Sequence, residues 1–203
     1  APESVDMALA VLTDVEKARK SLVMPFRAAT AYREMTKTQV DGRQKIMRGL
    51  SKAADLLMAN APVFAGRTLI ALDCSGSMRG MEGYKAVMEF ASVFAATLYR
   101  RNADHADLML FGADAIYASV DADVPLLALA DGLAQHDGGG TDFKPIFTKA
   151  RGKYDRVVLL SDMQGWINQI GPSGAFDDYC RRESARPKVF SFDLAGYGPL
   201  QFP

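Results

Sequence analysis

The sequence has few cysteines, no long apolar run and no excess of charge of either sign. Its two cysteines, Cys74 and Cys180, are too few for a disulfide framework, which favours a reducing compartment, so we expect a cytoplasmic protein. No segment approaches the roughly 18 consecutive apolar residues of a membrane-spanning helix, so we expect no membrane partner. The 24 basic and 24 acidic residues cancel, which argues against a strongly electrostatic nucleic-acid binder and leaves room only for a local basic patch.

The residue pattern changes near residue 63. Residues 1–62 predict a helical segment, with one helix between Asp6 and Met24 and another over Asp41–Asn60. Asp41 is expected to cap the second of these helices. From residue 63 to residue 203, strands and helices alternate, which predicts a second unit with an α/β fold and a mostly parallel sheet.

The α/β unit is expected to contain five strands and four long helices. The strands are Thr68–Asp73, Asp107–Phe111, Ala115–Val120, Arg156–Ser161 and Lys188–Asp193, and the helices are Met81–Arg101, Val124–Gln135, Phe143–Lys153 and Ala175–Arg182. The connection Gly112–Asp114 is too short for a parallel crossover, so Ala115–Val120 should be an antiparallel strand at the sheet edge.

Oxygen-bearing side chains follow the first of these strands and recur at two later points. Asp73-Cys74-Ser75-Gly76-Ser77 puts a carboxylate and two hydroxyls at alternate positions, a glycine run leads into Thr141, and Asp162 follows another strand. Open α/β sheets bind ligands at the carboxyl ends of their strands, so these groups should meet at one edge. Oxygen ligands suit a hard cation, Mg²⁺ or alternatively Mn²⁺ or Ca²⁺. The candidate metal ligands are Asp73, Ser75, Ser77, Thr141 and Asp162. Asp142 is interpreted instead as a helix cap and Ser161 as structural.

Several enzyme motifs are missing from this segment. An aspartyl phosphotransferase needs a second Asp two residues after the first, where this chain has Ser75. Neither Ser75 nor Ser77 lies in the Gly-x-Ser-x-Gly elbow of a serine hydrolase, and the P-loop motif is absent. We therefore expect a binding module and not an enzyme, with metal-assisted hydrolysis kept as an alternative.

The pattern Asp73-x-Ser75-x-Ser77, Thr141 and Asp162 resembles the metal-ion-dependent adhesion site of von Willebrand factor A (vWA) domains, over about residues 67–203. The resemblance implies a Rossmann-like fold with six strands in the order 3-2-1-4-5-6 and helices on both faces. It also implies that the two serines contact the metal directly, while the threonine and the acidic residues bind it directly or through water. One coordination position would remain for an acidic group of a protein partner.

Three segments outside this site resemble the C-terminal part of Ro (TROVE-module) ribonucleoproteins. They are Met24–Tyr32, Phe64–Leu69 and Phe192–Gly198. Those proteins join a ring of helical repeats, which binds small noncoding RNA, to an A domain. The resemblance implies that residues 1–62 are a remnant of the ring and residues 63–203 an A domain. The chain would be the metal-dependent protein-interaction module of a Ro-like RNA-binding protein, with RNA held mainly by helices outside it. The alternative is a free-standing adhesion or assembly-type A domain without RNA.

Two surface groups complete the candidates. Arg79 and Trp166 follow the site segments and would contact an acidic partner, although a plain surface role for Arg79 and packing for Trp166 remain open. Lys45, Arg48 and Lys52 share one helix face and would give weak contacts to RNA phosphate, with a solvated face as the alternative.

Overall fold

The α/β unit is built on a five-stranded sheet in the order β3-β2-β1-β4-β5. The computed structural model describes residues 2–79, 85–121, 123–164 and 173–196. The strands are β1 (Thr68–Asp73), β2 (Ala106–Phe111), β3 (Ala115–Tyr117), β4 (Arg156–Ser161) and β5 (Lys188–Asp193). All neighbours are parallel except β2 and β3, which pair antiparallel at one edge as predicted. The sixth strand implied by the vWA resemblance is wrong for the described residues, in which only Leu194–Gly196 follow β5.

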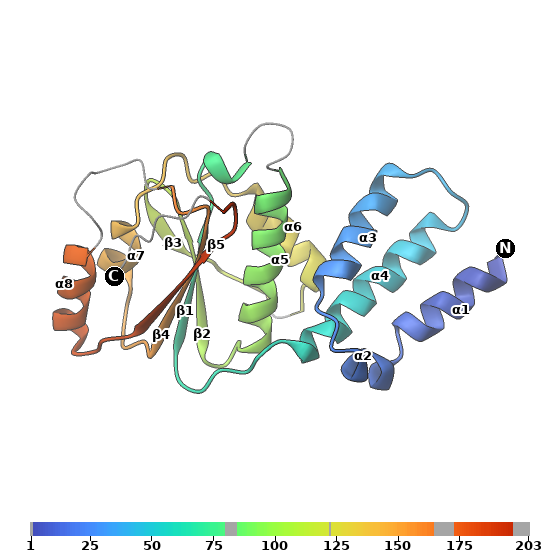
Figure 1. The fold of residues 1–203 in the computed structure, drawn as a ribbon, viewed down its shortest axis with the longest axis horizontal. Helices are drawn as coiled ribbons and strands as arrows, with labels where there is room; N and C mark the ends of the chain where they lie inside the picture. The colour runs from blue at the N-terminus through green and yellow to red at the C-terminus, as the bar shows by residue number, and fades with distance from the viewer. Residues whose placement is uncertain (1, 80–84, 122, 165–172, 197–203) are drawn as a thin grey trace.

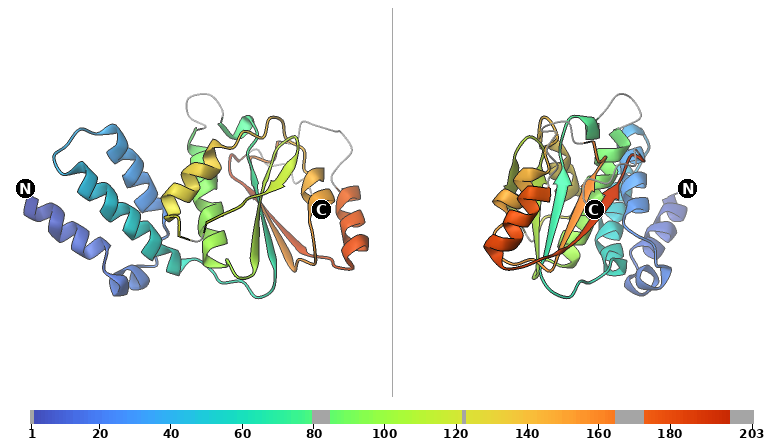
Figure 2. Two further views of the ribbon diagram at one scale, coloured as in Figure 1. Left: turned by 180° about the vertical axis from the view of Figure 1, so that it is seen from behind. Right: turned by 60° about the vertical axis from the view of Figure 1, so that its left-hand side comes forward.

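Helices cover both faces of this sheet (Figures 1 and 2). The helices are α5 (Lys85–Arg101), α6 (Leu126–Gln135), α7 (Lys144–Lys149) and α8 (Ser173–Glu183). The alternation of side chains along β1 explains the two layers, because Ile70 and Leu72 join the cluster of α5 and α6, whereas Leu69 and Ala71 join the cluster of α7 and α8. Every residue of β1 is buried, as expected for the central strand of a parallel sheet.

The N-terminal segment is helical, as predicted, but its boundaries differ. Its helices are α1 (Pro2–Leu12), α2 (Val15–Ser21), α3 (Phe26–Lys37) and α4 (Arg43–Leu57), followed by the 3₁₀ turn η1 (Met58–Asn60). The single helix expected between Asp6 and Met24 is wrong, because the Asp14 side chain accepts hydrogen bonds from two backbone N–H groups and starts a new helix. Asp41 does not cap α4, since Gly42 occupies the cap position at φ 75° and makes no side-chain bond.

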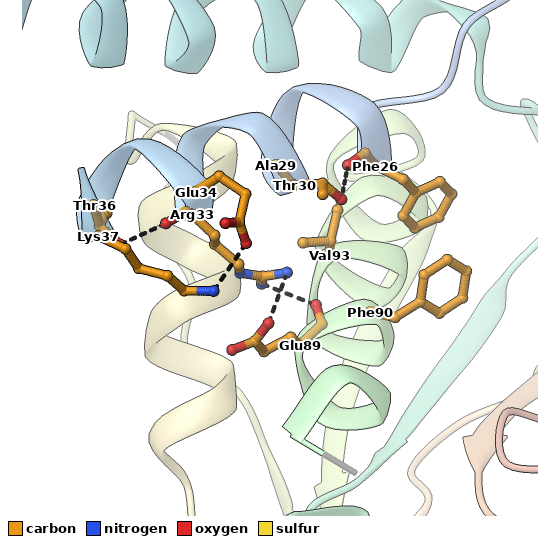
Figure 3. A pocket seen from close by; sticks show the side chains of 10 residues that line it. All are labelled: Phe26, Ala29, Thr30, Arg33, Glu34, Thr36, Lys37, Glu89, Phe90 and Val93. Atoms are coloured by element: carbon orange, nitrogen blue, oxygen red, sulfur yellow. Dashed lines mark hydrogen bonds and ion pairs between the residues drawn. The ribbon is translucent and has the colours of Figure 1, made fainter. Parts of the chain in front are cut away.

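Contacts from α3 and α4 join this segment to the α/β unit. Arg33 on α3 lies 3.5 Å from the Glu89 carboxylate on α5, and its guanidinium also donates to the Glu89 carbonyl (Figure 3). Beside this pair, the Phe26 and Phe90 rings stack with centroids 4.4 Å apart. On α4, the Asp55 carboxylate accepts a 2.8 Å hydrogen bond from the Leu126 backbone N–H, which begins α6.

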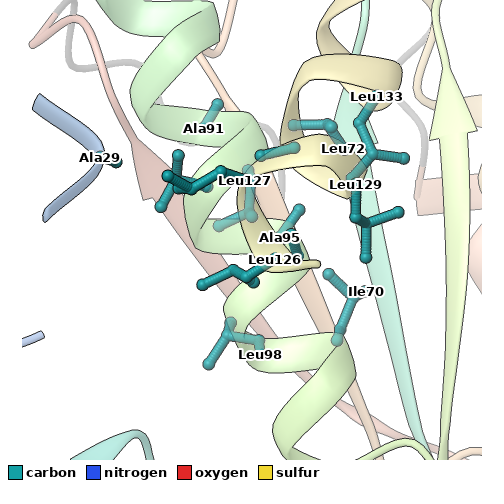
Figure 4. Packing of buried hydrophobic residues seen from close by; sticks show 14 of the residues in the cluster. Ala29, Ile70, Leu72, Ala91, Ala95, Leu98, Leu126, Leu127, Leu129 and Leu133 are labelled. Atoms are coloured by element: carbon teal, nitrogen blue, oxygen red, sulfur yellow. The ribbon is translucent and has the colours of Figure 1, made fainter. Parts of the chain in front are cut away.

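The larger core lies between α5, α6 and the sheet (Figure 4). Leu126 and Leu129 of α6 pack with Ala91, Ala95 and Leu98 of α5 and with Ile70 and Leu72 of β1. Ala29 of α3 belongs to the same cluster, so the hydrophobic core continues across the junction with the helical segment. Each large side chain fully buried here contributes about 1.5–3 kcal/mol of transfer free energy.

Other boundaries are shorter than the sequence suggested. Pairing of β3 stops at Tyr117, not at Val120. Helix α7 ends at Lys149, not at Lys153, because Gly152 adopts a φ of 82° and the Tyr117 hydroxyl accepts the Arg151 N–H. Among the described helices, none has the length and apolar character needed to cross a membrane.

Candidate metal centre

The carboxyl ends of β1 and β4 meet at the edge of the sheet that is uppermost in Figure 1. Leu72 of β1 pairs in register with Leu160 of β4, so Asp73 lies beside the residues that end β4. Oδ2 of Asp73 accepts a 2.5 Å hydrogen bond from the Ser161 hydroxyl, and Oδ1 accepts a 2.9 Å bond from the Ser75 N–H. Asp162 follows Ser161 and is 2% exposed. Two buried carboxylates, Asp73 and Asp162, therefore lie together where β1 and β4 end, a place that we call the metal corner.

The two serines after β1 come together in a tight turn. Ser75 and Ser77 have their hydroxyl oxygens 3.1 Å apart, and Ser77 opens the 3₁₀ turn η2 (Ser77–Arg79). The bond from the Ser75 N–H to Asp73 holds the turn against the end of β1. The two hydroxyl oxygens are close enough for one cation to contact both.

Backbone contacts carry the Thr141 loop into the same corner. The Gly138 N–H donates to the Cys74 carbonyl at 2.9 Å, and the Gly76 N–H donates to the Gly139 carbonyl at 2.8 Å. The approach requires glycine, because a Cβ on Gly112 would lie 2.2 Å from the Gly138 carbonyl oxygen. At the end of this loop, the Thr141 Oγ1 is buried and has no hydrogen-bond partner among the described residues.

Burial and mutual repulsion disfavour two negatively charged carboxylates at this corner when no cation is bound. The pKa of the Asp73 carboxyl is raised to about 6, mainly by burial. The hydrogen bonds from Ser161 and Ser75 act to lower this pKa, and the charge of Asp162 acts to raise it. Burial also raises the pKa of the Cys74 thiol to about 12, so this thiol stays protonated. Asp162 uses Oδ1 to accept the Gln164 N–H at 3.1 Å.

These residues fit a hard divalent cation. The corner holds a threonine hydroxyl that has no partner among the described residues, two serine hydroxyls 3.1 Å apart, and two buried carboxylates whose charges interact. All are oxygen donors, and a buried polar atom without a partner costs free energy unless a ligand satisfies it. No cluster of three or more His, Cys, Asp or Glu side chains with metal-ligand spacing occurs in the described part of the chain, so a cation here would depend on the hydroxyls.

Other sequence candidates lie around this corner or away from it. Arg79 donates from its guanidinium to the His136 carbonyl, so it ties η2 to the loop that leads to Thr141. Trp166 lies outside the described residues. Lys45, Arg48 and Lys52 are exposed on α4, far along the chain from the corner, and Lys45 forms an ion pair with Asp6 of α1.

Three residues near the corner hold its loops in place. Ser161 was interpreted as structural, and it anchors the Asp73 carboxylate. Asp142 accepts the Lys144 N–H at 2.9 Å, although Phe143 occupies the cap position of α7. Asp137 was not among the residues singled out from the sequence. Its Oδ1 accepts the Gly139 N–H at 3.0 Å, and an Asp just before a glycine run is a turn signal that would have found it.

The family model of the Ro60 vWA domain matches residues 67–191, more than half of the chain. The chain belongs to this vWA family. The match takes in β1, the Thr141 loop and the end of β4, so the candidate metal corner lies within the vWA domain.

Comparison with solved structures extends the likeness beyond the matched range. The crystal structure of the Deinococcus radiodurans Ro (RSR) protein is similar with a TM-score of 0.75 at 21% sequence identity. The match covers 97% of this chain and 42% of that protein, so the chain spans less than half of its length. The likeness is one of fold, and it includes the helical segment beside the vWA domain. A comparison with curated proteins gave no match.

Proposed function

We propose that this chain is the metal-dependent protein-interaction module of a Ro-like RNA-binding protein. The observation that carries the proposal is the corner itself, where the Thr141 hydroxyl, which is buried and finds no partner in the described part of the chain, accompanies two paired serines and two carboxylates whose charges interact. Asp73, Ser75, Ser77, Thr141 and Asp162 would hold Mg²⁺, Mn²⁺ or Ca²⁺. When bound, the cation would supply positive charge that accepts an oxygen from an acidic group of a partner.

The roles of the individual side chains follow from their contacts. Asp73 has both oxygens engaged by Ser75 and Ser161, so it orients the serine turn and adds negative charge behind it. The hydroxyls of Ser75, Ser77 and Thr141 are neutral donors, which leave more of a cation's charge for a partner carboxylate than carboxylate ligands would. Arg79 keeps the loop in place and adds positive charge beside the corner.

We propose binding and not catalysis for this corner. The Asp73 carboxylate, which a hydrolase would use to handle protons, is engaged by a hydroxyl and a backbone N–H that fix its orientation. The matching assay is phosphatase and nuclease activity with Mg²⁺. We expect none that disappears in Asp73→Asn, and such activity would support the hydrolase alternative.

The RNA role is proposed for the longer protein and not for this chain alone. The likeness to the Ro protein of Deinococcus supports it, together with the helical segment that both share. We infer that small noncoding RNA is held mainly by helices outside these residues, in a cytoplasmic setting that agrees with the two free cysteines.

Calorimetric titration with Mg²⁺ and Mn²⁺ tests the metal site. Asp73→Asn keeps the shape of the side chain and removes the charge. Its amide oxygen can still accept the Ser75 N–H, and its amide N–H can donate to the Ser161 hydroxyl, which reverses the direction of that bond. We expect measurable heats for the natural chain, loss of most binding in Asp73→Asn, and no change in the control Asp104→Ala, an exposed turn residue. Equal heats in all three proteins would contradict the proposal.

The acidic partner group is tested by a second titration. A peptide with an amidated C-terminus and a single Glu should bind the natural chain in Mg²⁺ and fail to bind in EDTA, whereas the same amidated peptide with Gln in place of Glu should fail in both. Metal binding without any preference for the Glu peptide would leave the site as a structural cation site and overturn the interaction role.

A further inference from the structure

The edge strand β5 has one apolar face that the described residues leave uncovered. A strand in a parallel sheet is normally buried on both faces, as β1 is. On β5, Phe190 and Phe192 are 46% and 40% exposed, although Val189 on the opposite face packs against the cluster of α7 and α8. In Figure 1, β5 crosses the front of the sheet beside α5, with no helix drawn over it.

A cavity lies between this face and α5. It has a volume of about 360 Å³, and its walls include Phe94 and Leu98 of α5, Val158 of β4, and Phe190 and Phe192 of β5. The Phe94 and Phe192 rings meet edge to face at 5.2 Å, so the apolar surface runs without a break from β5 onto α5. An exposed continuous apolar surface of this kind marks an interaction site more often than a scattered apolar residue does.

Two cations lie at one end of the same face. Arg156 and Lys188 are register partners at the start of β4 and β5, so their side chains share a face with Val158 and Phe190. Arg156 lines the cavity, stacks over Phe64, and donates to the Ala65 carbonyl. Within the part of the chain that the structure describes, neither Arg156 nor Lys188 forms an ion pair.

We propose that this face is the docking site of an amphipathic α-helix, supplied from outside residues 1–203, that carries an acidic end. A helix suits the site because α/β sheets are covered by helices, and the space lies beside α5, against which a second helix packs side by side. Its apolar stripe would cover Phe190, Phe192 and Phe94, and its acidic end would meet Arg156 and Lys188. The face runs along β5 from Lys188 at its amino end to Phe192 near its carboxyl end. None of the residues that line it is a candidate metal ligand, so the proposal does not depend on the metal site.

The probe is a fluorescent synthetic helix of about 16 residues, long enough to be helical when bound. It carries Leu and Phe at positions i, i+3, i+4 and i+7 and two Glu in its first turn. One control peptide has the same composition in scrambled order, and another has Lys in place of Glu. Fluorescence anisotropy measures binding to the 203-residue chain.

We expect the Glu helix to bind and the scrambled peptide not to bind. Phe192→Ser should weaken binding by about tenfold, because a buried aromatic contact is lost. Lys188→Glu should weaken the Glu helix and strengthen the Lys helix. The matched controls are Ile116→Ser, an equally exposed apolar residue on the opposite edge strand, and Lys153→Glu, and both should bind like the natural chain. Circular dichroism verifies that each variant is folded, and EDTA should change nothing.

Three outcomes would overturn the proposal. The first is no binding of the Glu helix at about 1 mM, a concentration that corresponds to only about 4 kcal/mol of affinity. The second is an equal loss of peptide affinity in Phe192→Ser and Ile116→Ser. The third is equal affinity for the Glu and Lys helices. Sedimentation velocity adds a further check. Self-association that disappears in Phe192→Ser would identify a second copy of the chain as the occupant instead.

Discussion

The hydroxyl of Ser161, at the end of β4, donates a 2.5 Å hydrogen bond to Oδ2 of Asp73, at the end of β1. The bond joins two neighbouring strands at the candidate metal corner and favours the ionised form of the carboxyl. Ser161 therefore both fixes the position of the Asp73 carboxyl and stabilises its negative charge.

Removing this hydroxyl should cost stability most at high pH. Ser161→Ala is expected to lower the free energy of unfolding by about 1.5–3 kcal/mol at pH 8, the range for a bond to a charged group. The loss should be smaller near pH 5, where Asp73 is largely protonated. Chemical denaturation measures it, with Ser92→Ala as the control, a buried serine that donates to a carbonyl within α5. Equal losses at both pH values would contradict the assignment.

The buried Asp73 should make the metal-free protein less stable as the pH rises. Its pKa is about 6 in the folded chain and 3.8 ordinarily, so between these values the folded state holds a proton that the unfolded state has released. Its contribution to stability therefore falls across this window, by about 3 kcal/mol in full. Melting curves of the natural chain and Asp73→Asn in EDTA isolate the effect, because other carboxyl groups cancel in the difference. Added Mg²⁺ should raise the melting temperature more at neutral pH than near pH 5. A difference that grows in favour of the natural chain with rising pH would refute this.

Substitution of Thr141 can distinguish a role of this residue as a metal ligand from a purely structural role. Thr141→Val removes a buried hydroxyl that has no partner among the described residues and keeps the shape of the side chain. The metal-free protein should keep or gain stability, by up to about 1–2 kcal/mol, since a desolvated polar group is lost. Mg²⁺ affinity should fall by about tenfold or more, equivalent to about 1.4 kcal/mol. A destabilised variant with unchanged Mg²⁺ affinity would assign Thr141 to the fold alone.

The glycine contact behind the Thr141 loop should be intolerant of a single methyl group. Gly112→Ala would place its Cβ 2.2 Å from the Gly138 carbonyl oxygen, so the loop must move and Mg²⁺ binding should be lost. The matched control is Gly132→Ala inside α6, where nothing lies within 4 Å of the added Cβ. That change should stabilise the protein by roughly 0.5–1 kcal/mol. Thermal unfolding and Mg²⁺ titration of both variants check the pair.

The chain by itself should bind structured RNA weakly. Replacing Lys45, Arg48 and Lys52 with Gln should reduce both the affinity and its salt dependence, with Lys45 contributing least because it is already paired with Asp6. Filter binding at several salt concentrations measures this, and Ser75→Ala should have no effect. Tight, sequence-selective binding that Ser75→Ala abolishes would show that the vWA domain itself reads RNA.

The strands and the metal candidates were accessible from the sequence because their signals are local. Apolar runs closed by polar turns placed β1, β4 and β5 at the bounds that the structure has, and β2 within one residue. Since parallel strands end at a common edge, the proximity of Asp73 and Asp162 followed from topology. The site as a functional metal centre stays a prediction.

The contacts that hold the site together could not be predicted from the sequence. The bond from Arg79 to the His136 carbonyl and the approach of Gly112 to Gly138 join segments that are distant in sequence, through backbone atoms that carry no side-chain signal. The break between α1 and α2 is a different case. An Asp directly before a helical stretch, as Asp14 is before Val15–Ser21, is a local signal for a helix start, which the apolar periodicity of the segment obscured.

Asp55 of the helical segment caps a helix of the vWA domain, so the two parts share more than a surface contact. Helix α6 has Pro125 at its cap position and no side-chain cap of its own, and the carboxylate that bonds its first N–H comes from α4. A negative charge at that place also complements the positive end of the α6 dipole. A chain that began at Val63 would lose this cap and would uncover the part of the α5 and α6 core against which Ala29 and Ala54 pack. Residues 1–62 and 63–203 differ in sequence pattern, yet we expect them to unfold together as one cooperative unit.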